Sequence, residues 1–185
     1  MSYWKYRRIT GFVSTLVLGF TVGGCDKLLT KAETRTPEPA DTWFVVKISD
    51  GDTIKVRQTN GQEKKIRFCG IDSPEKSQPL GQKSKANLQK LINEADGQVL
   101  ISEVEKDRYG RTVAEVFTSV QGKERSLNEE QLSSGNAYYY AKYAAKCPNN
   151  EVFARAEAIA KQKRLGVWSG DFEKPWDYRK RVRND

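Results

Sequence analysis

The sequence predicts an α+β domain in which five strands close into a small β-barrel and about three helices pack around it. Short β-branched runs are separated by Asp-Gly and Asn-Gly turns, which is typical of antiparallel strands. Longer stretches with apolar residues at helical spacing lie between and after these runs. A barrel is the expected closure, because it leaves no strand edge unpaired.

Five short runs rich in β-branched and aromatic residues are the expected strands. They lie at residues 43–48, 53–57, 65–71, 99–104 and 112–118. The turn at 50–52 joins the first two runs as a hairpin, Asn60-Gly61 leads into the third, and the turn at 107–110 joins the last two. Because side chains alternate along a strand, Arg67 is expected on the face opposite Ile66.

Three stretches with helical spacing are the expected helices. They lie at residues 79–95, 127–132 and 149–165. In the first, Leu88, Leu91 and Ile92 form one apolar stripe, which predicts packing against the barrel. We expect the folded domain to span residues 42–170, followed by a basic and aromatic tail at 171–185. The aromatic side chains of this tail are expected to pack on the domain, and its basic end to remain free.

The N-terminus has the layout of an export signal. Residues 1–24 contain basic residues, then a short apolar run, then small residues, and the end of this segment with Cys25 resembles a bacterial lipobox. This predicts lipidation of the Cys25 thiol, with a plain cleaved signal or an uncleaved anchor as alternatives. Residues 25–41 are polar and proline-containing, so we expect a flexible tether. The protein would then be lipid-anchored to the membrane of the cell envelope, or secreted if the anchor is absent.

The residue types present restrict the chemistry. The chain has a formal net charge of +8, which favours a polyanionic partner without identifying one. It contains no histidine and only three cysteines, which argues against a zinc site and excludes a histidine base. Any bound metal should therefore be a hard cation held by oxygen, and acid–base chemistry must use Asp, Glu, Lys or Tyr.

Cys69 and Cys147 form a candidate disulfide. Export would place both in an oxidising compartment, where a cysteine pair tends to become bridged. The bridge would close a long loop and stabilise the fold by up to about 4 kcal/mol in the chain-entropy model. Two buried thiols are the alternative, and spacing alone does not decide between them. If the bridge forms, we expect it to stiffen the strand that carries Arg67.

Three short segments concentrate acidic and basic side chains at expected turns. They are DGDT at 50–53, RFCGIDSPE at 67–75 and DRYGR at 107–111. If these strand ends converge on one rim of the barrel, Asp52 and Asp72 can share a cation, with the backbone carbonyl of Ser73 as a further ligand. This oxygen set suits one Ca²⁺ ion. Each segment alone is also ordinary turn chemistry, so the prediction depends on all three occurring in this order.

The remaining charged residues of these segments would supply the chemistry. Arg67 and Arg111 carry planar guanidinium groups, which bind phosphate oxygens and neutralise charge that develops during a displacement. Glu75 is placed to orient or deprotonate an attacking water. Two arginines, a cation and a carboxylate form a set that cleaves phosphodiesters.

These segments resemble the staphylococcal nuclease (thermonuclease) family. The resemblance covers roughly residues 43–170 and includes DGDTIKV, GIDSPE, DRYGR and the closing RLGVWS. It implies an OB-fold five-stranded barrel and Ca²⁺-dependent hydrolysis of DNA and RNA, with low sequence specificity and 3′-phosphate ends. By motif position it implies three metal-binding residues, Asp52, Asp72 and Ser73, and three catalytic residues, Arg67, Glu75 and Arg111. Asp50 would support the turn behind the ligands.

Tyr143 and Tyr109 are the candidate substrate-binding side chains. Tyr143 matches a position at which a tyrosine of the family packs against a nucleotide, whereas Ala141 stands where a second one would be. Packing in the core or at an interface is the alternative for the tyrosines around Tyr143. The loop at 75–81 is shorter than in the best-known member, so its mobility cannot be carried over.

The function expected from these observations is that of an exported, Ca²⁺-dependent endonuclease that acts on DNA and RNA as a monomer. The alternative is a catalytically weak, nucleic-acid-binding envelope lipoprotein that uses the same fold. Binding modules of that kind typically lose acidic or arginine positions. This chain keeps all five, which favours the enzyme.

Overall fold

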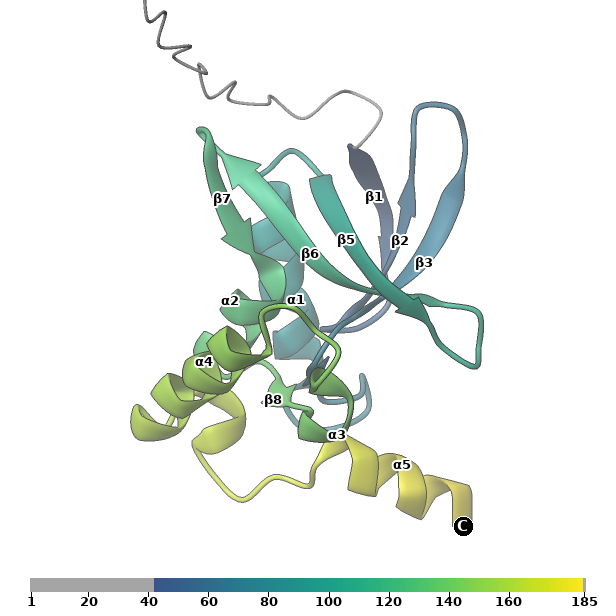
Figure 1. Cartoon of the computed structure of the whole chain (residues 1–185). Coiled ribbons are helices and arrows are strands. Elements are labelled where there is room, and N and C mark those ends of the chain that lie inside the picture. The colour runs from purple at the N-terminus through teal and green to yellow at the C-terminus, as the bar shows by residue number, and fades with distance from the viewer. Residues whose placement is uncertain (1–41, 185) are drawn as a thin grey trace, which may run out of the picture. The chain divides into compact units, whose positions relative to one another are not determined.

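The structure, a computed structural model, describes residues 42–184 (Figure 1). Its strands are β1 (Trp43–Ile48), β2 (Thr53–Arg57), β3 (Glu63–Phe68), β4 (Ile71–Asp72), β5 (Gln98–Lys106), β6 (Thr112–Val120), β7 (Lys123–Ser126) and β8 (Tyr138–Tyr139). Its helices are α1 (Gly81–Asn93), α2 (Leu127–Ser133), α3 (Ala141–Ala144), α4 (Asn150–Gln162) and α5 (Pro175–Asn184), with a 3₁₀ turn at Gly166–Trp168.

The predicted export signal, the lipidation site Cys25 and the tether at 25–41 lie outside the described residues. Within residues 42–184, no helix is both long enough and apolar enough to cross a membrane.

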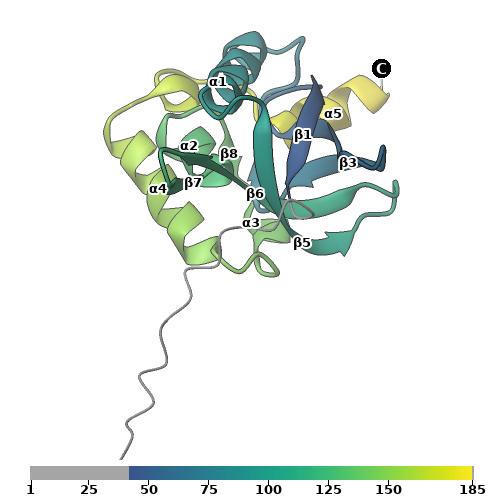
Figure 2. The same cartoon turned by 90° about the horizontal axis from the view of Figure 1, so that it is seen from above.

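Five strands form a closed, mixed β-barrel. β3, β2, β1, β5 and β6 are hydrogen-bonded in that order, and β3 also pairs in parallel with β6, which closes the ring. β7 extends the sheet beyond β6, while β4 and β8 form a separate two-stranded pair. Figure 2 gives the view from above, with α4 and α2 beside the strands. The prediction of an α+β fold with an OB-like five-stranded barrel is confirmed.

The alternation of side chains in β2 and β3 builds the barrel core and leaves one end of these strands for polar groups. The buried side chains that they contribute are Ile54, Val56, Ile66 and Phe68. Thr53 pairs with Arg67 across the two strands, and the Phe68 backbone N donates to the Asp52 carbonyl at 2.8 Å. The end of β3 therefore lies directly beside the DGDT turn.

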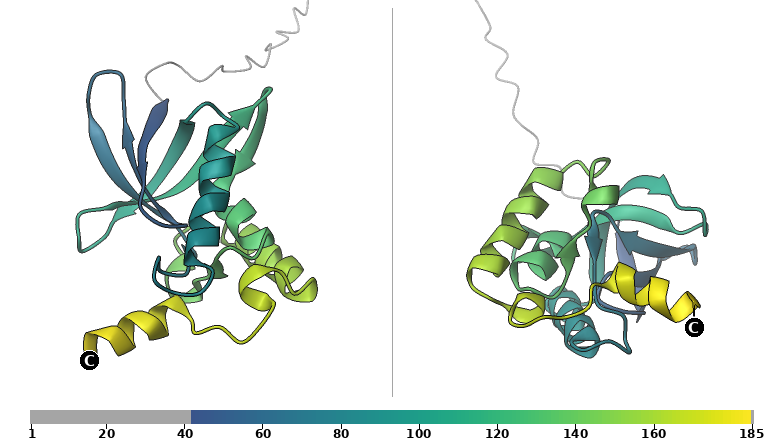
Figure 3. Two further views of the ribbon diagram at one scale, coloured as in Figure 1. Left: turned by 180° about the vertical axis from the view of Figure 1, so that it is seen from behind. Right: turned by 90° about the horizontal axis from the view of Figure 1, so that it is seen from below.

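The three predicted helices are present as α1, α2 and α4. The predicted stripe Leu88, Leu91 and Ile92 is buried in α1, which packs against β1 and α2, while α2 also contacts β6 and α4. Seen from behind in Figure 3, α1 runs along the barrel and α2 lies at its lower end. The sequence analysis missed α3 and α5, together with the short strands β4, β7 and β8.

The third strand ends earlier than predicted. Gly70 has φ +71°, and a Cβ atom at this position would lie 3.0 Å from Cys147 Sγ and 3.1 Å from the Phe153 ring. A residue with positive φ interrupts an extended strand. The chain therefore leaves the barrel after Phe68, and β4 starts at Ile71 with β8 as its new partner.

Cys69 and Cys147 form a disulfide, with their Cα atoms 5.9 Å apart. The predicted bridge is therefore present. It connects the residue after β3 to the segment between α3 and α4, and both cysteines are 1% exposed. Asn128 Nδ2 adds a hydrogen bond to the Cys69 carbonyl at 2.8 Å, so the end of β3 is tied to two helical segments.

Candidate active site

The DGDT turn is pressed against helix α1 and held by helix α2. A Cβ atom added at Gly51 would lie only 1.8 Å from Ser84 Oγ, so glycine is required here. The Gly51 carbonyl accepts a hydrogen bond from Gln131 Nε2 at 2.7 Å, and Asp50 Oδ1 accepts one from the Asp52 backbone N at 3.1 Å. These contacts fix the position of Asp52 at the start of β2.

Asp52 and the residues that follow β4 meet at this turn. Asp52 Oδ2 accepts a hydrogen bond from the Ser73 backbone N at 2.6 Å, and its Oδ1 accepts one from Thr53 Oγ1 at 3.0 Å. The side chain of Asp52 is 6% exposed and that of Asp72 is 1% exposed. The structure therefore brings two carboxylates from separate turns to one buried place.

Arg67 joins the two carboxylates. Its Nη1 lies 3.0 Å from Asp52 Oδ1 and its Nη2 lies 2.7 Å from Asp72 Oδ1. Burial lowers the pKa of Arg67, but the charges of Asp52 and Asp72 outweigh that effect, so the pKa is raised overall. The guanidinium group therefore stays charged although its side chain is only 13% exposed.

Negative charge is concentrated around Arg67. Burial, followed by the charge of Asp52, raises the pKa of Asp50 to about 7. Burial also raises the pKa of Asp72, although Arg67 opposes this effect. Carboxyl groups with raised pKa values are ones whose ionised form would be stabilised by additional positive charge.

A further guanidinium group reaches this place from the C-terminal helix. Arg179 Nη2 lies 2.7 Å from Asp72 Oδ2, and Nη1 lies 2.8 Å from Glu75 Oε1. Nη1 also donates to Asp72 Oδ1 at 3.1 Å. The expectation that the basic end of the tail remains free is therefore wrong for Arg179, because α5 carries it onto Asp72. Through this arginine, Glu75 belongs to the same cluster of charges.

Aromatic side chains lie next to the cluster. The Tyr140 ring stacks on Trp176 of α5 with the ring centroids 5.1 Å apart and an interplanar angle of 8°. Tyr143 makes an edge contact with Tyr140 at a centroid distance of 4.8 Å. Burial, followed by the charge of Asp72, raises the pKa of Tyr140. Tyr143 is 54% exposed, so a ring close to the cluster is open to solvent.

Arg111 and Tyr109 belong to a different local network. Arg111 Nε donates to Asp107 Oδ2 at 2.7 Å, and the Arg111 backbone N donates to Asp107 Oδ1 at 2.9 Å. The guanidinium groups of Arg108 and Arg111 lie over the Tyr109 ring, which is 68% exposed. Within the described part of the chain, no ion pair joins Arg111 to the carboxylates of the other two turns. The structure therefore does not bring the second candidate catalytic arginine into contact with the first.

The donor atoms at the cluster fit a hard cation. Asp52, Asp72 and the Ser73 carbonyl offer only oxygen, which is the donor that Ca²⁺ requires. The buried Ser73 Oγ beside them has no hydrogen-bond partner among the described residues. No group of three or more His, Cys, Asp or Glu side chains arranged for a metal occurs in residues 42–184. An ion here would therefore depend on two carboxylates, main-chain oxygen and water.

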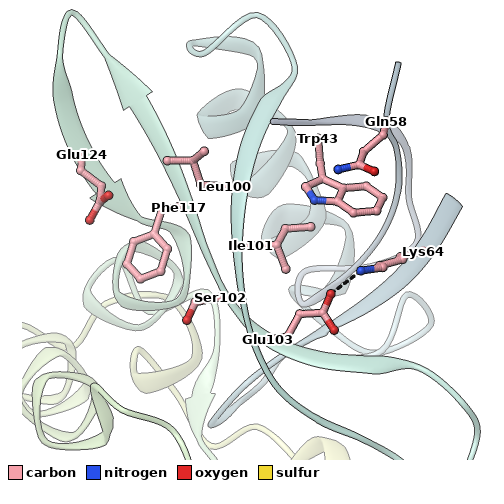
Figure 4. Close-up of a pocket in the computed structure, with 9 residues that line it drawn as sticks. All are labelled: Trp43, Gln58, Lys64, Leu100, Ile101, Ser102, Glu103, Phe117 and Glu124. Carbon is pink, nitrogen blue, oxygen red and sulfur yellow. Dashed lines mark hydrogen bonds and ion pairs between the residues drawn. The ribbon is translucent and has the colours of Figure 1, made fainter. Parts of the chain in front are cut away.

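A separate groove of about 510 Å³ lies on the barrel, away from this cluster (Figure 4). Its lining residues are Trp43, Gln58, Lys64, Leu100, Ile101, Ser102, Glu103, Phe117 and Glu124. The only charged pair drawn there is Lys64 with Glu103. The groove contains no paired carboxylates facing an arginine, so its chemistry does not match that of the cluster.

The sequence analysis missed Arg179 and Trp176 as residues of the site. A signal was present, since Pro175 stands where a helix would begin and proline is favoured at the first helical position. A helix from Pro175 places Trp176 and Arg179 three residues apart on one face. The prediction of a tail with a free basic end at 171–185 overlooks this helix signal.

Similarity to known proteins was found in bacteria and plants. The chain is 36% identical to an uncharacterized endonuclease of Haemophilus influenzae over 129 residues, which covers 70% of this chain and 67% of that protein. It is 34% identical to a micrococcal nuclease of Shigella flexneri over 146 residues, covering 76% of this chain and 81% of that protein. A staphylococcal-like nuclease of Arabidopsis thaliana is 37% identical over 120 residues, which is 64% of this chain but only 34% of that protein.

The match to a family model covers more than half of the chain. Residues 65–170 match the model described as staphylococcal nuclease homologue. This range includes Arg67 in β3, Asp72 in β4 and the turn that holds Arg111. The chain therefore belongs to the staphylococcal nuclease family.

Proposed function

We propose that the chain is a Ca²⁺-dependent nuclease that hydrolyses phosphodiester bonds in DNA and RNA with low sequence specificity. One observation carries this proposal. Arg67 bridges Asp52 and Asp72, and Arg179 links Asp72 to Glu75. The nuclease names of several relatives support it. The net charge of +8 suits a polyanionic substrate.

In this proposal Asp52, Asp72 and the Ser73 carbonyl hold the ion. When bound, Ca²⁺ would supply positive charge that stabilises negative charge on a phosphate oxygen. Arg67 lies between both ligands and would direct its guanidinium toward the same phosphate. Because Arg67 is held by buried partners, little of its freedom would be lost when substrate binds.

Glu75 is the proposed base. It would take a proton from the attacking water as the water oxygen bonds to phosphorus, and the bond from phosphorus to the 5′ oxygen would break. The 5′ oxygen would take a proton from solvent water and leave as a hydroxyl group, so the phosphate remains on the 3′ end. Arg111 would neutralise the charge that develops on the phosphate, which requires it to exchange Asp107 for substrate.

Tyr143 and Tyr109 are the proposed contacts to the nucleotide. Both rings are exposed, and exposed aromatic rings stack on bases without sequence preference. We also propose export with lipidation at Cys25, or secretion if the anchor is absent. The layout of residues 1–25 and the Cys69–Cys147 disulfide support this, since disulfides persist outside reducing compartments. All proposed catalytic groups come from one chain, which is consistent with action as a monomer.

A catalytically weak, nucleic-acid-binding lipoprotein is the second candidate. One observation favours it: Arg179 engages both Asp72 and Glu75, and Arg111 is paired with Asp107 instead of facing them. Such an arrangement retains a basic surface while its carboxylates are occupied.

Cleavage of a labelled single-stranded DNA by the purified chain separates the two candidates. We expect cleavage with Ca²⁺, none with a chelator, and products that a polymerase extends only after phosphatase treatment. Glu75→Gln should lower kcat by at least about 100-fold. The matched control is Glu151→Gln, which changes a carboxylate that is 85% exposed on α4 and should leave the rate unchanged. Binding without cleavage in the wild type would favour the second candidate.

A further inference from the structure

Helix α5 is docked on the domain by contacts that do not involve charge at the cluster. Pro175 is buried, and the Trp176 ring stacks on Tyr140 and meets Tyr138 edge-on at a centroid distance of 5.8 Å. Tyr178 Oη lies 2.6 Å from Ser77 Oγ. The position of α5 is thus determined by aromatic packing and by the loop that follows β4.

The segment before α5 is held by the same loop. Gln78 Nε2 donates to the Glu173 carbonyl at 2.9 Å, and Gln78 Oε1 accepts from the Glu75 backbone N at 2.9 Å. One side chain therefore links the backbone of Glu75 to the start of the C-terminal segment. In the view from below in Figure 3, α5 lies across the end of the barrel, in front of the first strands.

Arg179 is carried on the docked helix to the place where a cation is expected. It engages both Oδ atoms of Asp72 and Oε1 of Glu75. Arg67 already forms ion pairs with Asp72 Oδ1 and Asp52 Oδ1, and Ser73 N donates a hydrogen bond to Asp52 Oδ2. All four oxygens of the two candidate metal ligands therefore have donors, and two of the Asp72 contacts come from Arg179.

A metal ion and Arg179 would contact the same carboxylate oxygens of Asp72. Ca²⁺ binds carboxylate oxygens directly at about 2.3–2.6 Å, and a second cation on the same carboxylate is repelled by the first. Arg67 comes from a barrel strand, is only 13% exposed and is held by both Asp52 and Asp72. Arg179 is 37% exposed and comes from a helix attached at the edge of the domain, so it is the cation that can be displaced.

We infer that Arg179 and the divalent cation compete for Asp72, so that docking of α5 sets the affinity of the site for metal. This inference rests on the proposed function, because it takes Asp72 as a metal ligand. Arg179 acts through Asp72 and Glu75 and is a positioning residue. With α5 docked, Glu75 forms an ion pair with Arg179, and the charge of Asp72 is balanced by Arg67 and Arg179. Metal binding releases Arg179 and leaves Glu75 able to accept a proton.

Calcium binding to the full chain, measured by calorimetry without nucleic acid, tests this inference. We expect Arg179→Ala to bind Ca²⁺ at least about tenfold more tightly than the wild type, because the ion no longer has to displace a cation. The matched control is Lys180→Ala, which removes the same charge from the next, exposed position of α5 and should change the affinity less than twofold.

A second variant separates competition from the loss of charge. Trp176→Ala keeps Arg179 but removes the ring that stacks on Tyr140. If docking of α5 holds Arg179 on the carboxylates, this variant should also bind Ca²⁺ more tightly, by several-fold. Wild-type affinity in Arg179→Ala would overturn the competition, and wild-type affinity in Trp176→Ala alone would overturn the role of α5 docking.

Melting temperatures with and without Ca²⁺ provide a readout that a purely structural role would not change. Without metal, Arg179→Ala should melt below the wild type, because Glu75 loses this partner and Asp72 keeps only Arg67. With saturating Ca²⁺ this difference should vanish or reverse, since the ion takes over the charge. An equal deficit under both conditions would show that Arg179 only stabilises the fold.

The outcomes distinguish this inference from the proposed function. If the wild type cleaves DNA with Ca²⁺ and Arg179→Ala binds the ion equally well, the inference fails and the proposed function stands. If neither protein binds Ca²⁺ and the wild type does not cleave DNA, both fail together.

Discussion

Two arginines at the ends of neighbouring strands are held in very different ways. β3 and β6 run in parallel, and Arg67 pairs with Val113, only two residues beyond Arg111. Arg67 is bound by carboxylates of two other segments and is 13% exposed. Arg111 is bound by Asp107, four residues earlier in its own turn, and is 25% exposed.

This difference indicates that the two arginines have different roles, one in the stability of the site and one in the reaction. Removing one partner of a buried ion pair leaves an uncompensated charge, whereas a more accessible pair within one turn contributes less to stability. Arg67 therefore holds the site together, and Arg111 belongs to a turn that can release it toward a phosphate. The predictions below separate these two roles, in decreasing order of their expected effect on stability.

Arg67→Ala should have the largest effect. Asp52 would lose the guanidinium that faces it, and Asp72 would keep only Arg179, which should lower the free energy of unfolding by about 3 kcal/mol. The rate of DNA cleavage should also fall by at least about 100-fold. Urea denaturation and a cleavage assay measure the two effects. Arg67→Lys should recover part of the stability but little of the rate, because lysine lacks the planar fork. Wild-type stability in the alanine variant would contradict the bridging role.

Gly51→Ala should displace the DGDT turn, which carries the Arg67 partner Asp52. The added Cβ would collide with Ser84 Oγ, so we expect a loss of about 1–3 kcal/mol in the free energy of unfolding. Displacement of Asp52 should also reduce cleavage. The control is Gly61→Ala, where φ is +87° but nothing lies within 4 Å of the new atom. That variant should lose about 1 kcal/mol and keep full activity.

Arg111→Ala should lower the cleavage rate about as much as Arg67→Ala, but it should lower the stability of the fold far less. The pair of Arg111 with Asp107 is half-buried and lies within one turn, so it should contribute only about 1 kcal/mol to stability. The cleavage rate should nevertheless fall by about 100-fold if the guanidinium reaches the phosphate. Arg155→Ala, at a position on α4 that is 69% exposed, serves as the control for charge. Unchanged cleavage by Arg111→Ala would remove Arg111 from the proposed mechanism.

Asp107→Asn should produce the smallest change, and one that depends on pH. Burial alone would raise the pKa of Asp107, but hydrogen bonds from Arg111 and from the Tyr109 backbone lower it overall. A lowered folded-state pKa stabilises the protein above the ordinary value of 3.8 and loses this effect as the pH falls through the folded value. The wild type should therefore melt above Asp107→Asn at pH 7, and this difference should shrink as the pH falls below 3.8. A difference that persists in acid would contradict this.

The sequence predicts those parts of the site that depend on short-range structure. Asp52, Arg67 and Asp72 lie at the ends of paired strands, and a turn with an alternating strand pattern is enough to place them together. The barrel was predictable for the same reason, although its closure through parallel β3 and β6 adds a contact between distant strands. The two-residue strands β4 and β8 carry too few residues for a periodic signal.

Other features could not be predicted because they depend on distant contacts or on competition between partners. Arg179 meets Asp72 across 107 positions of sequence. Its place is decided by the packing of Trp176 on Tyr140, and no local pattern reports such a contact. For Arg111, the motif suggested convergence with the carboxylates, but it did not show that Asp107 in the same turn would be its partner.

The central claim is that carboxylates from two separate turns hold one cation beside Arg67. A crystal structure of the full chain grown with Ca²⁺ tests it most directly. We expect one ion within about 2.3–2.6 Å of oxygens from both Asp52 and Asp72, with Arg67 still in place and Arg179 moved away from Asp72. An ion bound elsewhere, or no ion on Asp52 and Asp72 at saturating Ca²⁺, would contradict the claim.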